Sequence, residues 1–525
     1  MRSKLLTVAI AAGLGLTSFS ALAATPKSQQ PTRVTIDAAT LQQLQAQLAA
    51  LQSQVADLQA KQEAQADAQV ETAKAVNDAQ VAATDAAAAS KKSSDKIAYK
   101  GVNITLGGFL AAESIYRTHQ EGADIASNYN SIPYKNTPAG HLSEGRFSAR
   151  QSRISMLAQG DINPDTHVAG YIEADFLGGA QTANQNESNS FNPRERNVYM
   201  TIDWDKPGLH LLAGQNWSLL TLNTKGITPR TEAAPPQIDA QYVPGFSWAR
   251  QPQIRLVKDW NKEYWLGISL ENPQTTFYVS PNQAKAPVTS IYNTAAGSGY
   301  DSANTLSVNH IPDVIVKFAA DPGFGHYEIF GLGRAFYNRY NSGSGPSNHD
   351  VYGGGFGVGM ILPVVEKFLD FQFSGMQGRG IGRYGSAQLP DVTFKPNGSI
   401  APIKENMVLA GLTLHANPDM DIYLLGGREH EDAKAFSYNG VPLGYGNAAY
   451  SNAGCDIEGG ACVGNTKQIY QGTLGFWWKF YQGKFGKAQF GAQYSHTVRD
   501  SFEGVGGSAK AKEDMVFTSF RYYPF

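Results

Sequence analysis

The feature that most constrains this chain is the alternation of short and long connecting segments after residue 100. Seven short connections carry turn residues: DINPD (161–165), DKPG (205–208), WNKE (260–263), DPGFG (321–325), LPVV (362–365), NPD (417–419) and YQGK (481–484). Eight long polar segments rich in Gly, Asn and Ser lie between them, at 118–145, 178–193, 219–250, 273–311, 339–349, 379–404, 431–465 and 500–511. Seven and eight connections together join sixteen segments, and strict alternation brings every long connection out at the same end of the fold.

The joined segments have the period of β-strands. In VNITLGGFLAA, apolar or small residues from Val102 to Ala112 alternate with Asn103, Thr105 and Gly107. The segments YQGTLGFWWKF and KAQFGAQYSH alternate in the same way near the C-terminus, which is the signature of strands with one apolar face. We therefore predict an all-β fold, a sixteen-stranded antiparallel transmembrane β-barrel over 101–525 with short periplasmic turns and long external loops. A soluble sandwich has no reason to sort its loops in this way.

The N-terminus predicts export. Residues 1–23, MRSKLLTVAIAAGLGLTSFSALA, have a basic start, an apolar core and an A-x-A site, so we expect a signal peptide cleaved after Ala23 rather than a membrane anchor. No later run reaches the roughly 18 to 20 apolar residues of a spanning helix, which leaves a soluble periplasmic protein or a barrel. Charged residues are only 17%, with 54 Gly and 25 each of Tyr and Phe, as in a β-rich chain. The formal charge of −2 gives no indication of nucleic-acid binding.

A helical segment precedes the predicted barrel. After a polar stretch at 24–36, apolar residues recur with spacings of three and four: Leu41, Leu44, Leu48, Leu51, Val55 and Leu58. This is a heptad seam, which needs a second helix to pack against. We predict a periplasmic coiled coil over 37–90, followed by a linker at 91–100; the alternative is an Ala/Gln-rich tether. Leu at both seam positions does not decide the number of helices.

Two cysteines and two short motifs are candidates for chemistry. Cys455 and Cys462 lie in an exported chain with no histidines nearby, so we expect a disulfide rather than a metal site. GIGRYG (380–385) matches a dinucleotide-binding pattern, but no helix pattern follows it and it begins a long loop. His430 lies among acids at a strand end, where solvated charge is commoner than a metal site. No catalytic motif occurs, and we expect neither enzymatic activity nor a cofactor.

Alternation also sorts charged residues between the lipid and the lumen. Those expected to face the lumen are Arg153, Arg255, Lys317, Arg334, Glu173 and Asp175. They either pair across a wet pore or, where arginines cluster, create a positive potential that favours anions. We expect Arg153 and Arg255 to help set the selectivity.

In the C-terminal stretch MVFTSFRYYPF, the pattern leaves open whether Arg521 faces the lipid or the lumen. A terminal Phe525 resembles the C-terminal signal that the barrel-assembly machinery reads in outer-membrane proteins, and Tyr522 and Tyr523 suit the interfacial girdle. Counting back in twos from Phe525 turns Arg521 toward lipid. A bulge at Pro524 would shift the register and turn Arg521 into the lumen.

Several motifs resemble one porin family. AGQNWS (213–218), ARQPQIR (249–255), the RYYPF ending and the heptads ahead of the barrel are similar to the DcaP-like outer-membrane porins. The resemblance implies homotrimers, a periplasmic coiled coil and passage of small anions such as dicarboxylates, with Arg250 and Arg255 as pore arginines. It also implies that the third long loop narrows the pore. The charged residues in that loop are Lys225, Arg230, Glu232 and Asp239.

The function expected from these observations is passive diffusion of small polar solutes, with anions favoured. The setting would be the outer membrane of a Gram-negative bacterium, among lipid and lipopolysaccharide. Two alternatives stay open: a porin for uncharged, sugar-type solutes, in which an aromatic track replaces the lumen arginines, and a structural tether or adhesin with a closed barrel.

Overall fold

A computed structural model describes residues 96–178, 188–288, 290–293, 306–341, 343 and 345–524. They belong to one of two compact units of the chain, Lys91–Phe525. The expected signal peptide, polar stretch and coiled coil (1–90) lie outside the described residues, as does the terminal Phe525. No helix in the described part is long and apolar enough to cross a membrane.

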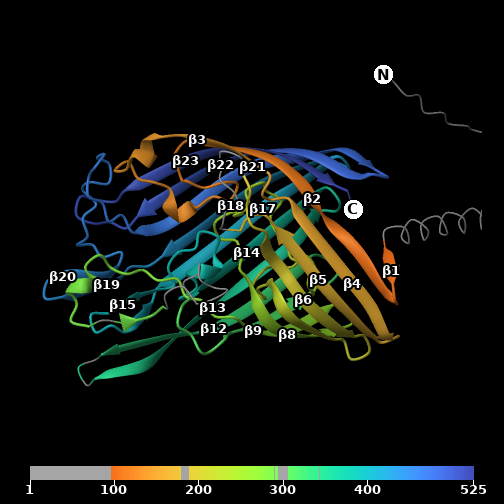
Figure 1. The fold of residues 1–525 in the computed structure, drawn as a ribbon, viewed down its shortest axis with the longest axis horizontal. Coiled ribbons are helices and arrows are strands. Elements are labelled where there is room, and N and C mark those ends of the chain that lie inside the picture. The colour runs from red at the N-terminus through yellow and green to blue at the C-terminus, as the bar shows by residue number, and fades with distance from the viewer. Residues whose placement is uncertain are drawn as a thin grey trace, which may run out of the picture. The chain divides into compact units, whose positions relative to one another are not determined.

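The unit is a closed antiparallel barrel, as predicted (Figure 1). Its strands are β2 (Val102–Arg117), β3 (Glu144–Ser148), β4 (Arg153–Asn163), β5 (Thr166–Asp175), β6 (Arg194–Trp204), β7 (Leu209–Trp217), β8 (Arg250–Trp260), β9 (Tyr264–Glu271), β11 (Asp313–Ala320), β12 (His326–Asn341), β13 (Pro346–Val365), β14 (Leu369–Arg379), β17 (Lys404–Asn417), β18 (Met420–Glu431), β21 (Thr466–Gly483), β22 (Gly486–Ser501) and β23 (Lys510–Tyr523). Since β3 and β4 both pair with β2 as two halves of one strand, these make sixteen barrel strands. The last strand pairs with the first, from Leu110 opposite Tyr522 to Arg117 opposite Met515, and so closes the sheet.

The barrel forms because the alternating side chains suit two environments, with apolar residues facing lipid outside and the others facing the lumen. Large apolar side chains such as Leu110, Ile254 and Phe356 are exposed on the outer face. The residues between them point inward and are mostly buried, which agrees with the period-two pattern of the sequence. Sheet closure leaves no free strand edge in the wall.

The connections match the expected plan, with small differences at their ends. The long loops gather at the left end of Figure 1 and the short turns at the right end. LPVV (362–365) is wrong as a turn, because β13 continues through Val365 and the chain turns at 366–368. The segment 339–349 is mostly strand, since β12 and β13 pair as far as Asn341 and Pro346. The expected linker 91–100 contains a short strand, β1 (Ile97–Tyr99), that folds back on β2.

Shorter strands occur within the long loops. They are β10 (Ser290–Ile291), which pairs with β12, the hairpin of β15 (Val392–Phe394) with β16 (Ile400–Pro402), and the hairpin of β19 (Lys434–Tyr438) with β20 (Val441–Tyr445). Single turns of 3-10 helix occur at Tyr129–Ser131, Pro138–His141, Gln283–Lys285 and Gly382–Tyr384. We number the long loops in chain order and use three of them below: loop 1 (118–143), loop 3 (218–249) and loop 6 (380–403).

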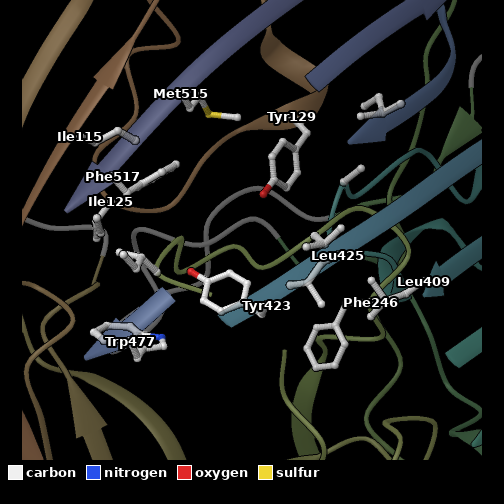
Figure 2. Packing of buried hydrophobic residues seen from close by; sticks show 14 of the residues in the cluster. Ile115, Ile125, Tyr129, Phe246, Leu409, Tyr423, Leu425, Trp477, Met515 and Phe517 are labelled. Atoms are coloured by element: carbon white, nitrogen blue, oxygen red, sulfur yellow. The ribbon is translucent and has the colours of Figure 1, made fainter. Parts of the chain in front are cut away.

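Much of the lumen holds a hydrophobic core rather than water. Ile125 and Tyr129 of loop 1 and Phe246 of loop 3 pack against inward side chains of the wall, among them Leu425 and Phe517 (Figure 2). A second cluster joins the start of loop 3 to β8, β9, β11 and β12. The loops therefore fill part of the barrel and leave a narrower passage than the wall alone would enclose.

The C-terminal strand corrects one expectation. The pairing of β22 with β23 runs without a register shift from Asp500 opposite Lys510 to Lys487 opposite Tyr523. Arg521 and Tyr523 share the inward face with the buried Phe517, while Phe520 and Tyr522 face outward. Arg521 thus points into the lumen by simple alternation, and no bulge at Pro524 is needed.

Candidate pore site in the barrel lumen

Loop 3 crosses the inside of the barrel. It leaves β7 and reaches the opposite wall, where Trp477 Nε1 donates to the Pro236 carbonyl at 2.7 Å and the Ile238 amide donates to Gln493 Oε1 at 2.6 Å. Further along, the Gly245 amide donates to Glu429 Oε1 at 2.7 Å. The long loop expected to narrow the pore therefore lies within it.

Glycines allow this close approach. Gly245 of loop 3 has a positive φ of 92°, a conformation that glycine adopts at little cost. On the wall, a Cβ added at Gly427 would overlap the Pro244 carbonyl oxygen, so the loop backbone lies directly on β18. Pro244 and Gly245 can sit there only because the wall residue beneath them has no side chain.

Loop 6 lies against loop 3 and shares its anchor. Glu429 Oε1 also accepts the Ala387 amide at 3.0 Å, and Ser386 Oγ donates to the Val243 carbonyl at 2.6 Å. A Cβ at Gly382 or Gly385 would press on the carboxylates of Glu405 or Glu429. The glycines of GIGRYG thus serve close packing against the wall.

A cavity of about 540 Å³ lies in the lumen beside loop 3; we call it the lumen cavity. Its wall comes from β2, β4–β6, β18 and β21–β23. The basic residues that line it are Arg153, Arg196, Lys479, Lys487 and Arg521, and the acidic ones are Glu173, Asp175, Asp239 and Asp421. Five basic against four acidic groups leave little net charge, so the pairing of these groups decides what an ion meets.

Most of the acids are already paired. Glu173 accepts Arg196 Nε at 2.6 Å and lies 3.6 Å from Arg153. Asp175 binds Arg194 at 2.7 Å and Arg196 at 2.9 Å, and Asp421 binds Lys479 at 2.7 Å. Glu173 and Asp175 thus face three guanidiniums, of which Arg153 and Arg196 line the cavity and Arg194 does not. This group of five side chains has a net positive charge.

Three cations of the cavity lie over aromatic rings, and Arg153 shares the Phe109 ring with Arg521, with its guanidinium 5.2 Å from the ring centre. The Arg521 guanidinium lies 4.8 Å from the Phe109 ring centre and 4.7 Å from that of Trp477, and it donates to Glu113 at 2.9 Å. The Lys487 ammonium lies 4.1 Å from the Tyr523 ring and has no ion pair among the described residues. Such rings hold a cation in place without neutralising it.

The ionisation of loop 3 side chains reports the local field. Burial opposes ionisation of the Tyr242 phenol, yet the guanidiniums of Arg196, Arg153 and Arg250 hold its pKa below the usual value. Burial raises the pKa of the Asp239 carboxyl, which Arg117 offsets only in part. A phenol that ionises more easily despite burial marks a region of positive potential.

Three expected lumen residues point inward but lie under the loops. Arg255 is 3% exposed and donates to the Trp217 carbonyl at 2.6 Å. Lys317 is fully buried between Thr221 and Glu328, and Arg334 binds Asp313 at 3.1 Å. None of the three lines the lumen cavity.

The pore residues implied by the family resemblance do not gather at the lumen cavity. Arg250 stacks on the Trp217 ring at 4.5 Å and is not part of the cavity wall. In loop 3, Lys225 and Arg230 are exposed and Glu232 is half-buried. Of the four charged residues expected in loop 3, only Asp239 lines the cavity, where its carboxylate accepts a hydrogen bond from the Ser127 amide at 3.1 Å.

Sequence reasoning missed Arg196, Lys479 and Lys487. Arg196 follows a register shift between β5 and β6, beside Glu173 and Ala174, so counting in twos from Val198 turns it to the wrong face. Lys479 lies within a second irregularity, between Trp478 and Tyr481. The Glu173 and Asp175 pair on β5 was the available signal, because buried carboxylates need cationic partners.

The remaining expectations concern cysteines and metals. Cys455 and Cys462 form a disulfide, as predicted. His430 lies 3.5 Å from Asp432. Among the described residues, no group of His, Cys, Asp or Glu has an arrangement that could hold a metal ion.

Comparison with solved structures gives the fold a precedent. The outer membrane channel DcaP of Acinetobacter baumannii is 18% identical, with 81% of this chain and 98% of that chain covered and a TM-score of 0.58. The chain has the fold of that channel. The resemblance expected from the sequence is thus confirmed at the level of the fold. OmpF of Salmonella typhi (9% identity, 82% and 99% covered, TM-score 0.44) and an anion-selective porin from Comamonas acidovorans (11%, 80% and 99%, 0.43) are less similar.

The sequence comparisons give no match. No protein-family model matches the chain, and no curated protein matches it significantly.

Proposed function

We propose that the chain is a porin of the Gram-negative outer membrane, through which small polar solutes diffuse passively with anions favoured. The observation that carries this proposal is the lumen cavity, where five basic side chains against four acidic ones lie inside a closed barrel with an apolar outer face, and where Lys487 has no ion pair among the described residues. A charged cavity within a lipid-facing wall has the arrangement of a selective pore. The fold shared with the DcaP channel supports it.

Anion preference is supported by the pairing within the cavity. Lys487 has no ion pair among the described residues, and Glu173 and Asp175 are shared among the three guanidiniums of Arg153, Arg194 and Arg196. Aromatic rings at Phe109, Trp477 and Tyr523 favour the alternative of an uncharged, sugar-type solute, but each contacts a cation rather than forming a bare track. The loop packing inside the lumen is what a closed-barrel tether would need.

One experiment separates these functions. The purified full chain is inserted into a planar lipid bilayer under a KCl gradient, and single-channel steps and the reversal potential are measured. An anion-selective porin gives discrete steps with a reversal potential displaced toward that of chloride. A reversal potential near zero with sugar uptake in liposome swelling would favour the uncharged-solute porin, and no steps at all would favour the tether.

The proposed partners follow from outer surfaces of the barrel. For a homotrimer we propose the face of β2, β3 and β23, where Phe147 is 92% exposed beside an outer groove of about 1100 Å³ lined by Leu110 and Phe520. For lipopolysaccharide we propose the long-loop end of β14 and β17, where Arg379 and Lys404 are paired across strands and exposed. Lys404 already pairs with Asp432 at 2.7 Å, so Arg379 is the cation of this pair that has no ion pair among the described residues and could bind an anionic headgroup.

Two further partners rest on residues outside the described part. We propose that the barrel-assembly machinery recognises Phe525, and that the coiled coil at 37–90 lies in the periplasm, on the side of the short turns. The start of β2 lies at that end of the barrel, so a chain leaving it N-terminally would enter the periplasm.

A further inference from the structure

Four histidines lie inside the barrel next to its short turns. Of the ten histidines in the sequence, His167, His210, His326 and His415 each lie within a few residues of a short turn, at 164–165, 205–208, 321–325 and 418–419 respectively. All four point inward, since they share their strand faces with the inward residues Glu173, Leu212, Glu328 and Leu409. They therefore form a set at one mouth of the lumen.

Each of these imidazoles lies between two carboxylates. The distances from its two ring nitrogens to the nearest carboxylate oxygens are 2.6 and 3.2 Å for His167 (Asp161, Asp205), 2.7 and 3.0 Å for His210 (Asp203, Asp259), 2.7 and 3.0 Å for His326 (Asp321, Glu328), and 2.8 and 3.2 Å for His415 (Asp421, Asp370). In three of the four sets, both acids lie on strands or turns other than that of the histidine; the exception is the His326 set, in which Glu328 is also on β12. The imidazoles therefore also link neighbouring parts of the rim.

The chemistry of these sets assigns their protonation. An ionised carboxylate only accepts hydrogen bonds, whereas a neutral imidazole has one N–H and one acceptor nitrogen. Carboxylates at both ring nitrogens therefore require both to carry hydrogen, and the ring is then an imidazolium cation. Each set of two carboxylates and one imidazolium has a charge of −1, which becomes −2 when the ring loses its proton.

The other charges packed against these sets keep their sign across the histidine range. Lys317 lies 2.7 Å from Glu328, and Lys479 lies 2.7 Å from Asp421. Beside the His167 set, Lys206 pairs with Asp165. At His210 the ring packs against Trp265, with 5.7 Å between ring centres. Histidine is the side chain in these sets whose ordinary pKa lies near neutral pH, so the imidazoles control the change.

We propose that His167, His210, His326 and His415 are specificity-determining residues at the periplasmic mouth of the pore. The inference rests on the proposed porin function, which places the short turns on the periplasmic side. With four imidazoliums the four sets together carry −4, and with four neutral rings they carry −8; with the paired Lys317 and Lys479 included, the charge goes from −2 to −6. The histidine protons thus prevent the mouth from becoming strongly acidic, and their loss turns it into a barrier to anions. The selectivity of the pore then depends on the pH of the periplasm.

The test varies pH on one side of a planar bilayer. Channels of the full chain are measured under a salt gradient at low ionic strength, where fixed charges are least screened. Raising the pH of the short-turn side from about 6 to about 9, a range that covers histidine titration, should lower the anion-to-cation permeability ratio about threefold. The same change on the long-loop side should have a much smaller effect.

Two variants assign the effect to the histidines. His167 and His415 are the more exposed members, at 36% and 35%, so the double variant His167→Gln/His415→Gln should fold. It should show a reduced ratio already at pH 6 and about half of the response to pH. His496→Gln is the matched control, because His496 pairs with Asp514 at 2.7 Å on the outer face of β22.

The outcomes separate this inference from the function on which it rests. Channels that conduct but show no response to pH on the short-turn side would overturn the inference and leave the porin function intact. An equal response in the wild type and in His167→Gln/His415→Gln would also overturn it. Absence of conduction in any preparation would instead refute the porin function.

Discussion

Arg153 and Arg255 have the same charge and both point into the barrel, yet their surroundings give them different roles. Arg153 lines the lumen cavity, and its Nε has no hydrogen-bond partner among the described residues. Arg255 lies under loop 3 and donates to Gln253 and to the Trp217 carbonyl. A half-buried cation that lines the cavity acts on passing ions, whereas a fully buried hydrogen-bonded one holds the wall and the loop together.

Replacing Arg153 with Ala should therefore lower the anion-to-cation permeability ratio. A unit charge a few ångströms from an ion in a wet pore is worth about 1 kcal/mol, which corresponds to about a fivefold change in the ratio. Reversal potentials at low and high salt would measure it, and the effect should fade at high salt because of screening.

Arg255→Ala is the matched control and carries its own expectation. Loss of hydrogen bonds from a buried charged group should cost about 2 kcal/mol of stability, seen as a lower unfolding temperature in detergent, with little change in selectivity. A larger effect on selectivity from Arg255→Ala than from Arg153→Ala would contradict the roles assigned to both.

At the scale of elements, the pore depends on how loop 3 and loop 6 lie on β17 and β18. Glu429 accepts amides from both loops, and glycines on both sides of the contact leave no space for a side chain. The constriction is thus built by backbone packed on backbone, which is more rigid than a contact between long side chains.

Gly427→Ala should displace loop 3 from the wall. Its Cβ would overlap the Pro244 carbonyl oxygen, and overpacking of this kind costs about 1–3 kcal/mol. We expect a larger single-channel conductance with more current noise. Gly426→Ala is the control, because a Cβ there meets only ordinary contacts on the outer face; equal conductance in both variants would mean that loop 3 does not limit the pore.

At the scale of the whole molecule, closure of β23 on β2 makes every strand depend on its neighbours. A closed barrel has no free strand edge at which unfolding could begin at a low cost in free energy. The outer face is apolar and the inner face polar or filled by loops, so the fold suits a membrane and not water.

The folded chain should therefore show heat-modifiable migration. In unheated detergent samples it should run as a compact species, and after boiling it should run more slowly, near the mass of its unfolded mature chain. Fractionation should recover it with outer membranes, because the lipid-facing belt is exposed. Recovery in the soluble periplasmic fraction would refute a transmembrane barrel.

The wall of the barrel follows from local sequence pattern. Alternation decides which side of a strand each residue occupies, so it assigns Glu173 and Arg153 to the lumen and Leu110 to the lipid. The order of short and long connections decided the strand number and the end at which the loops emerge. Alternation and the order of connections are local properties, which can be recognised over about ten residues at a time. Alternation gives the wrong face where the register shifts, as at Arg196.

The contents of the lumen, by contrast, depend on long-range contacts. That loop 3 and loop 6 fold inward, that Arg255 and Lys317 are covered while Lys487 is not, and that four histidines gather at one mouth all depend on contacts between residues far apart in the chain. No local pattern specifies such contacts, because a polar Gly/Pro-rich loop has the same composition whether it extends into solvent or crosses a pore. Closing the barrel brings those segments within reach of one another, and the charges that face the solute then follow from what the loops leave exposed.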